Sequence, residues 1–277
     1  PENGMPGPVC DLSSVRESVC IHTKKIFDSC RDKDCVESLR FYPTQAAQEV
    51  LSTAQIIKGG CAELLYVYTD VEPITFNRGF YSIDMRFFYR VTLQVGTGTP
   101  RSTEVEGLCV FDKRCILFGS EGSAKTFSSG TALENIAPQR SLPAAVVEAV
   151  DPIVLDTRIT EDGSSSGTGE GSVSEIPAAI AAAFASPLVL DPTGNRRYYV
   201  TLGQFSLVRL ERDTQLLIPA YDYCLPEKEC ACQGAECGED PCEIFRKVQF
   251  PVDEFFPPNS VSPKTATSYQ EARGCCS

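Results

Sequence analysis

The sequence contains no tryptophan, one histidine (His22) and two methionines among its 277 residues. With a single histidine, one chain cannot build a metal site from several imidazole ligands, as many zinc enzymes do. Long apolar runs are missing too. The longest, residues 176–190, is interrupted by two prolines, whereas a helix that crosses a bilayer needs about 20 apolar residues. We therefore expect no membrane span.

Positive charge is scarce: 25 Lys and Arg stand against 37 Asp and Glu, which gives a formal net charge of −12. Because a nucleic-acid backbone repels such a chain, we expect no nucleic-acid partner. The sequence also lacks a phosphate-binding loop and the GxGxxG, GxSxG and HExxH patterns that mark common catalytic sites. No spacing singles out two carboxylates for acid–base chemistry. We predict that the protein is not an enzyme and has no cofactor.

Cysteine, in contrast, is abundant, with 14 residues. That is more than a typical cytosolic enzyme carries and fewer than a small disulfide scaffold. The even count allows up to seven bridges but does not fix their pairing. We expect most of these residues to form disulfides within or between chains. The candidates are Cys10, Cys20, Cys30, Cys35, Cys109, Cys115, Cys224, Cys230, Cys232, Cys237, Cys242, Cys275 and Cys276.

Residues 20–35, CIHTKKIFDSCRDKDC, combine sulfur and charge more densely than any other stretch. Three interpretations remain open. Cys20, His22, Cys30 and Cys35 offer the ligand types of a Cys3His zinc site, but their spacing fits paired zinc knuckles only loosely. A thiol activated by neighbouring cations is the second interpretation. The third, disulfide or interfacial structural use, is the one that we favour.

The C-terminal cysteines form a second cluster between Cys224 and Cys242, with the spacing C-x5-C-x-C-x4-C-x4-C. This matches neither iron–sulfur ligation nor a zinc ribbon, so we predict a loop held by disulfides. Cys275 and Cys276 are adjacent and can bridge each other only with strain. We expect them to lie on a tail that reaches a neighbouring subunit; the alternative is an unstructured end with two unpaired thiols.

The clearest structural signal is in residues 83–95, where every second residue is apolar, with Phe88 as the exception. This alternation predicts a long strand with one buried face. Residues 44–57 have helical spacing, with Thr44 as N-cap. Residues 36–41 suggest a helical turn. A change of apolar parity predicts a bulge at Gly203.

A hairpin is predicted over residues 105–118, turning at Asp112-Lys113, which would bring Cys109 and Cys115 together across the strands. Residues 142–156 and 176–191 resemble each other, and we read each as a short Ala-rich helix followed by a strand.

We predict a mainly β fold, a β-sandwich or paired sheets with a few short helices and a Cys-rich C-terminal segment. The expected divisions are residues 1–60, an arm and Cys/His segment with one helix; 61–223, a β-rich core; and 224–277, a Cys-rich loop and Pro-rich tail.

Three runs carry a family resemblance: residues 20–35, residues 71–92 (VEPITFNRGFYSIDMRFFYRVT) and residues 210–224 (LERDTQLLIPAYDYC). They resemble cysteine-rich, functionally uncharacterised proteins of spore-forming, mostly anaerobic Firmicutes, and the resemblance covers about residues 10–245. It implies no activity or site residue, only the context of a sporulating bacterium.

From these observations we expect a structural subunit that assembles with copies of itself into a filament or surface layer and is stabilised by disulfides. The expected location is extracellular or on the spore surface, with the cytoplasm as the alternative. The alternative function is a metal-binding or thiol-redox protein that uses Cys20, His22, Cys30 and Cys35.

Overall fold

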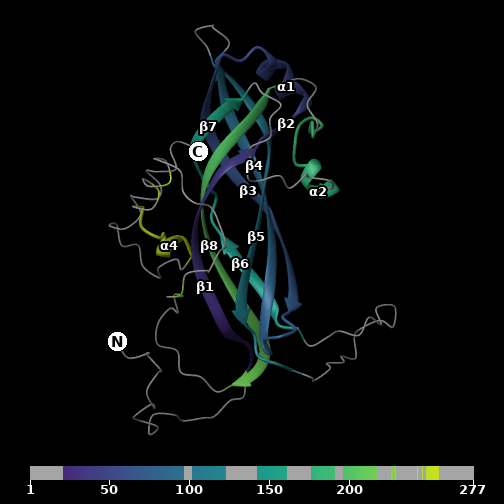
Figure 1. The fold of residues 1–277 in the computed structure, drawn as a ribbon, viewed down its shortest axis with the longest axis vertical. Coiled ribbons are helices and arrows are strands. Elements are labelled where there is room, and N and C mark those ends of the chain that lie inside the picture. Colours follow the sequence, from purple (N-terminus) through teal and green to yellow (C-terminus); the bar gives the residue numbers. More distant parts are fainter. Residues whose placement is uncertain are drawn as a thin grey trace.

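Two antiparallel β-sheets pack face to face in the computed structural model of the chain (Figure 1). The structure describes residues 21–96, 102–122, 142–160, 176–190, 196–216, 226, 228, 242, 245 and 248–255. Far more of these residues lie in strands than in helices, which confirms the predicted fold class. The division into three segments stays a prediction.

Sheet A is organised around its central strand, β8 (Arg197–Leu216). Along one edge β8 pairs with β1 (Ile21–Arg40) over almost its full length. Along the other edge it pairs first with β7 (Ile153–Thr160) and then with β6 (Ala144–Ala149). Strands distant in the sequence therefore lie side by side.

Sheet B has the order β2-β5-β4-β3. Its strands are β2 (Tyr42–Pro43), β5 (Thr103–Phe118), β4 (Phe80–Gly96) and β3 (Ile56–Pro73). The alternating residues of 83–95 on β4 are all buried in the core between the sheets, as predicted. Phe88 points to the other side, where it packs with Leu108, Ile180 and Phe184 beneath α2 (Ala178–Ala181).

Helix α1 (Gln45–Ser52) begins where the sequence predicts, because the Thr44 hydroxyl accepts a hydrogen bond from the Ala47 amide at 3.3 Å. It ends earlier than predicted, at Thr53, and strand β3 starts at Ile56. The helix buries Ala47 and Leu51 against the core. Figure 1 shows α1 at one end of the sandwich, α2 near β2 and β4, and α4 (Val252–Phe255) beside β1.

Several local predictions are wrong. Residues 103–118 form one continuous strand, β5, and not a hairpin, because Asp112 and Lys113 are each paired with residues of other strands. Residues 36–41 belong largely to β1 and form no helical turn. The first Ala-rich copy forms strands β6 and β7, whereas the second contains helix α2.

The bulge expected at Gly203 lies on the neighbouring strands instead. Register shifts occur in β7 between Val154 and Asp156, and in β1 between Val36 and Leu39. The apolar parity of β8 changes because both of its faces are buried. Val200 and Leu202 face the core between the sheets, whereas Phe205 lies under the C-terminal segment.

Candidate functional site

Strand β1 sorts the residues of the Cys-rich segment onto two faces of sheet A, because side chains alternate along a strand. Cys30 is buried in the core between the sheets, and Asp32 and Asp34 contact Lys113 of the opposite sheet. Lys33 and Cys35 point to the outer face, where they meet the C-terminal segment. The segment thus forms two sites, an inner charge cluster and an outer staple.

The inner charge cluster consists of Asp32, Asp34 and Lys113, at the seam where β1 of sheet A meets β5 of sheet B. The Lys113 side chain is only 2% exposed, and its ammonium group donates to a carboxylate oxygen of Asp34 at 2.6 Å and to one of Asp32. A buried lysine needs such partners, because an unpaired ammonium group is costly to remove from water. The cluster therefore ties the two sheets together.

Burial raises the pKa of the Asp34 carboxyl to about 6, because desolvation disfavours its charged form. Lys113 lowers this pKa, and the neighbouring Asp32 charge raises it further. Burial also raises the pKa of Tyr89, which faces the same interior from β4. The cluster holds two carboxyl groups against one cation, and Asp34 is the carboxyl that takes up a proton near pH 6.

Carboxylates bridge the seams at other points too. A carboxylate oxygen of Asp28 on β1 accepts a hydrogen bond from the Phe118 amide of β5 at 3.0 Å. At the opposite seam, where β3 lies beside β6 and β7, the Asp151 carboxylate accepts a hydrogen bond from the Leu64 amide of β3 at 2.9 Å. These bonds satisfy backbone donors at strand edges that would otherwise be open to pairing with another chain.

The outer staple is the disulfide between Cys35 on β1 and Cys242, which joins residues 207 positions apart with a Cα–Cα distance of 5.6 Å. Such a crosslink stabilises the fold by roughly 2–5 kcal/mol, mainly by restricting the unfolded chain. It fastens the C-terminal segment to the outer face of sheet A.

Aromatic side chains complete the staple. The Phe245 ring lies 4.7 Å from that of Phe205 on β8 and packs directly over Gly203, where a Cβ atom would come within 2.8 Å of the ring. The Lys33 ammonium lies 4.9 Å from the centre of the Phe245 ring and donates to the Val248 carbonyl at 2.8 Å. Cation–π contact and hydrogen bond together hold the segment in place.

The remaining described cysteines have separate roles. Cys30 and Cys61 are also disulfide-bonded, and Cys61 was not among the cysteines expected to be. Cys109 and Cys115 are buried free thiols. Burial raises the pKa of Cys109 far above its ordinary range and that of Cys115 to about 11. Both therefore stay protonated and unreactive at neutral pH.

The expected approach of Cys109 and Cys115 across a hairpin is wrong, because they lie six residues apart on one strand. At about 3.4 Å per residue this separates them by roughly 20 Å. Eight other candidate cysteines lie outside the described residues: Cys10, Cys20, Cys224, Cys230, Cys232, Cys237, Cys275 and Cys276.

The alternative metal set is not brought together by the described part of the fold. His22, Cys30 and Cys35 are spread along the extended strand β1, over roughly 40 Å from His22 to Cys35 at about 3.3 Å per residue. His22 is exposed, and Cys30 and Cys35 are each in a disulfide. No group of three potential metal ligands is present among the residues that the structure describes.

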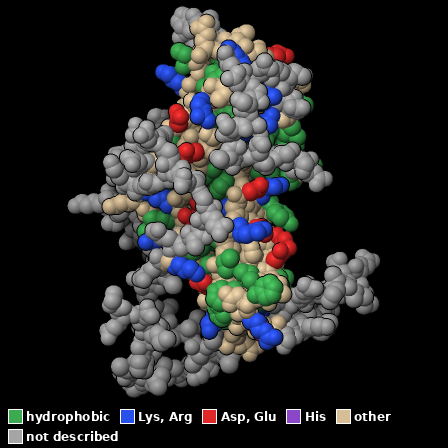
Figure 2. Space-filling model, in the orientation of Figure 1, with side chains coloured by type: hydrophobic (Ala, Val, Ile, Leu, Met, Phe, Trp, Pro, Cys, Tyr) green, Lys and Arg blue, Asp and Glu red, His purple; other side chains and the backbone are tan. Residues whose placement is uncertain are grey.

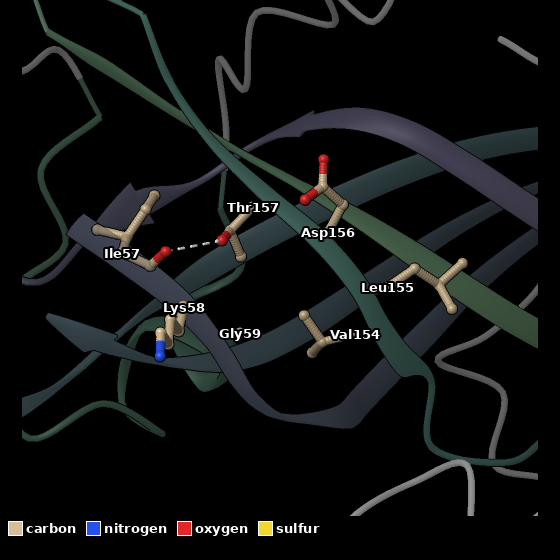
Figure 3. Close-up of a pocket in the computed structure, with 7 residues that line it drawn as sticks. All are labelled: Ile57, Lys58, Gly59, Val154, Leu155, Asp156 and Thr157. Carbon is tan, nitrogen blue, oxygen red and sulfur yellow. Dashed lines mark hydrogen bonds between the residues drawn. The ribbon is translucent and has the colours of Figure 1, made fainter. Parts of the chain in front are cut away.

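A hollow of about 360 Å³ lies at the seam between β3 and β7 (Figure 3). The Thr157 hydroxyl donates to the Ile57 carbonyl across it, at 3.3 Å. Figure 3 shows the charged ends of Lys58 and Asp156 pointing to opposite sides. The polar groups that line it do not converge on a common point.

The chain is similar to an exosporium protein. It is 23% identical over 276 residues to exosporium protein A of Clostridium sporogenes (strain ATCC 15579), a match that covers 93% of this chain and 77% of the relative. No protein-family model and no solved structure matches it. The similarity to a protein of a spore-forming anaerobe confirms the resemblance seen in the sequence. None of the helices in the described regions is long and apolar enough to cross a membrane.

Proposed function

We propose that the protein is a structural subunit of the spore surface that associates with copies of itself and is stabilised by disulfides. The observation that carries the proposal is the similarity, over 93% of the chain, to a protein named for the exosporium. Because the similarity extends over most of both chains, it includes the sandwich as well as the Cys-rich segments.

Two features of the fold support a structural role rather than a chemical one. The described cysteines are either disulfide-bonded or buried as unreactive thiols. The Cys35–Cys242 bridge fastens the C-terminal segment to a strand near the other end of the described chain. A sandwich crosslinked in this way is more resistant to unfolding than the same sandwich without the disulfide. The protein acts as a non-enzymatic, cofactor-free building unit in this proposal.

The location is tested with an antibody raised against the purified chain, applied to intact spores and to fractions of growing cells. We expect labelling of the spore surface and release of the protein by hot detergent only when reductant is present. Antigen found only in the soluble fraction of growing cells would contradict the proposed location.

Self-association is tested on the purified full-length chain by electron microscopy and by gels of samples heated with and without reductant. We expect ordered multimers that reductant weakens. A monodisperse monomer that contains a stoichiometric metal ion, measured by elemental analysis, would favour the metal-binding alternative instead.

A further inference from the structure

The outer face of sheet B carries a square of alternating charges on its two neighbouring strands β4 and β5. We define this charge square as Asp84, Arg86, Asp112 and Arg114. In the antiparallel register, Asp84 lies opposite Arg114 and Arg86 lies opposite Asp112. Both pairs are bidentate: Arg86 donates to Asp112 at 2.6 and 2.9 Å, and Arg114 donates to Asp84 at 2.5 and 3.0 Å.

The charge square is open to solvent. The side chains of Arg86 and Asp112 are 40% and 48% exposed, and those of Arg114 and Asp84 are 68% and 37% exposed. From the row of Phe88 and Val110 onward, this face is covered by the segment around α2, through Ile180 and Phe184. The half that carries the charge square has no such cover among the described residues.

We propose that this face binds the same face of a second copy of the chain, related by a two-fold axis that lies between the copies and runs across the strands. This inference rests on the proposed self-association and specifies one of its contacts. The rotation places Asp84 over the partner's Arg86 and Arg114 over the partner's Asp112. Each charge then has one opposite charge within its own chain and another across the contact.

The residues around the charge square match under the same rotation. On β3, Tyr68 lies beside Arg86 and Asp70 lies beside Asp84, so the Tyr68 hydroxyl of one copy faces the Asp70 carboxylate of the other. The face thus meets its own copy with opposite charges and with a donor against an acceptor.

A second copy fits this face better than a charged partner does. The chain has a formal net charge of −12, so most of its surface repels a second copy. The neutral face that carries the charge square is an exception. The charge square itself is neutral and self-complementary. Figure 2 shows hydrophobic side chains gathered near the lower end of the sandwich in that view, with charges of both signs above them.

The contact is small. Three strands about 4.8 Å apart and the two rows of the charge square, about 6.7 Å apart, span roughly 14 by 13 Å, far less than the ~800 Å² per partner of a typical stable complex. We therefore expect a weak contact that gains strength when it is repeated in an assembly. It should be measurable as a monomer–dimer equilibrium at high protein concentration.

Two variants test the arrangement while keeping the ion pairs within the chain. The pair swap, Asp84→Arg with Arg114→Asp, leaves opposite charges across β4 and β5 but places like charges over each other in the proposed contact. The full swap adds Arg86→Asp and Asp112→Arg, which restores the alternating square. Equal unfolding midpoints for wild type and both variants show that the fold is unchanged.

Sedimentation equilibrium of full-length protein with its accessible thiols alkylated is the measurement. We expect the pair swap to weaken dimerisation at least about tenfold, the full swap to restore it, and mixtures of wild type with the full swap to form no mixed dimers. A pair swap that dimerises like the wild type would overturn this arrangement. An axis along the strands would give that result, because it places residue 84 over residue 114 and residue 86 over residue 112, which keep opposite charges in the pair swap.

The same experiment separates this inference from the proposed function. If wild type stays monomeric here but ordered multimers still form through other contacts, the inference fails and the proposed function stands. If neither dimers nor multimers form under any of these conditions, both fail.

Discussion

At the scale of single residues, Lys113 shows how a charged side chain can belong to a β-sandwich core. It lies on a strand whose neighbouring inward residues include Cys109 and Cys115, both buried. Its position is tolerated because two carboxylates of β1 meet it from the opposite sheet. Removing one member of such a buried group leaves an uncompensated charge, which costs more than the pair contributes.

Asp34 gives the cluster a dependence on pH with a definite sign. Its pKa is about 6 in the folded protein against an ordinary value of 3.8, so the folded state binds more protons than the unfolded state between these values. The contribution of Asp34 to stability therefore falls as the pH rises through this window, by roughly 3 kcal/mol. Below pH 3.8 this penalty is absent.

Asp34→Asn should remove this pH dependence, because an amide does not ionise. We expect the stability of the variant, relative to wild type, to rise by about 2.4 kcal/mol between pH 4 and pH 7. Urea unfolding at several pH values measures it, with Asp213→Asn, an exposed position on β8, as the control. A difference between Asp34→Asn and wild type that stays constant with pH would contradict the assignment.

At the scale of elements, the sequence predicts best where one face of a strand is buried and the other is wet. Strand β4 meets this condition over residues 83–95 except at Phe88, and its alternation predicts the strand. Strand β1 has a partly polar inner face and a covered outer face, so its 20 residues carry no simple apolar alternation. Its polar residues are satisfied by partners that are remote in the sequence.

The same limit explains β5 and the first Ala-rich copy. Asp112 and Lys113 look like turn residues, but Arg86 and the carboxylates of β1 hold them within a strand. Residues 144–149 have helical composition and form β6 because β8 offers them an edge to pair with. The inner charge cluster was likewise beyond prediction, because only the fold brings Lys113 to β1.

Gly203 on β8 tests how the C-terminal segment packs on sheet A. A Cβ atom there would meet the Phe245 ring at 2.8 Å, so Gly203→Ala should destabilise the fold by roughly 1–3 kcal/mol. Gly96→Ala is the matched control, because its nearest neighbour would be 3.7 Å away. Chemical denaturation gives both values.

A double-mutant cycle shows whether Phe245 is the cause. Combining Gly203→Ala with Phe245→Ala should cost clearly less than the sum of the two single changes, because the clash disappears with the ring. Additive costs would mean that Gly203 matters for another reason, such as the conformation of β8.

At the scale of the whole molecule, the fold depends on pairing segments from opposite ends of the described chain. Cys35 on β1 lies opposite Gly203 on β8, 168 residues later (203 − 35). Contacts this remote make folding slow, because the loop between them must close before the pairing stabilises anything. With the bridge from Cys35 to Cys242 in place, the loop that must close to pair Cys35 with Gly203 contains only 39 residues (242 − 203).

Chains unfolded with their disulfides intact should therefore refold faster than fully reduced chains. Shortening the loop from 168 to 39 residues lowers the closure cost by about 1.3 kcal/mol, which corresponds to about a tenfold faster rate if β1 and β8 are paired in the transition state. Refolding from guanidinium, followed by far-ultraviolet circular dichroism, gives the two rates. Cys115→Ala should leave their ratio unchanged, since Cys115 forms no bridge. Equal rates with and without the disulfides would place β1–β8 pairing after the rate-limiting step, and the crosslinks would then act only on the finished fold.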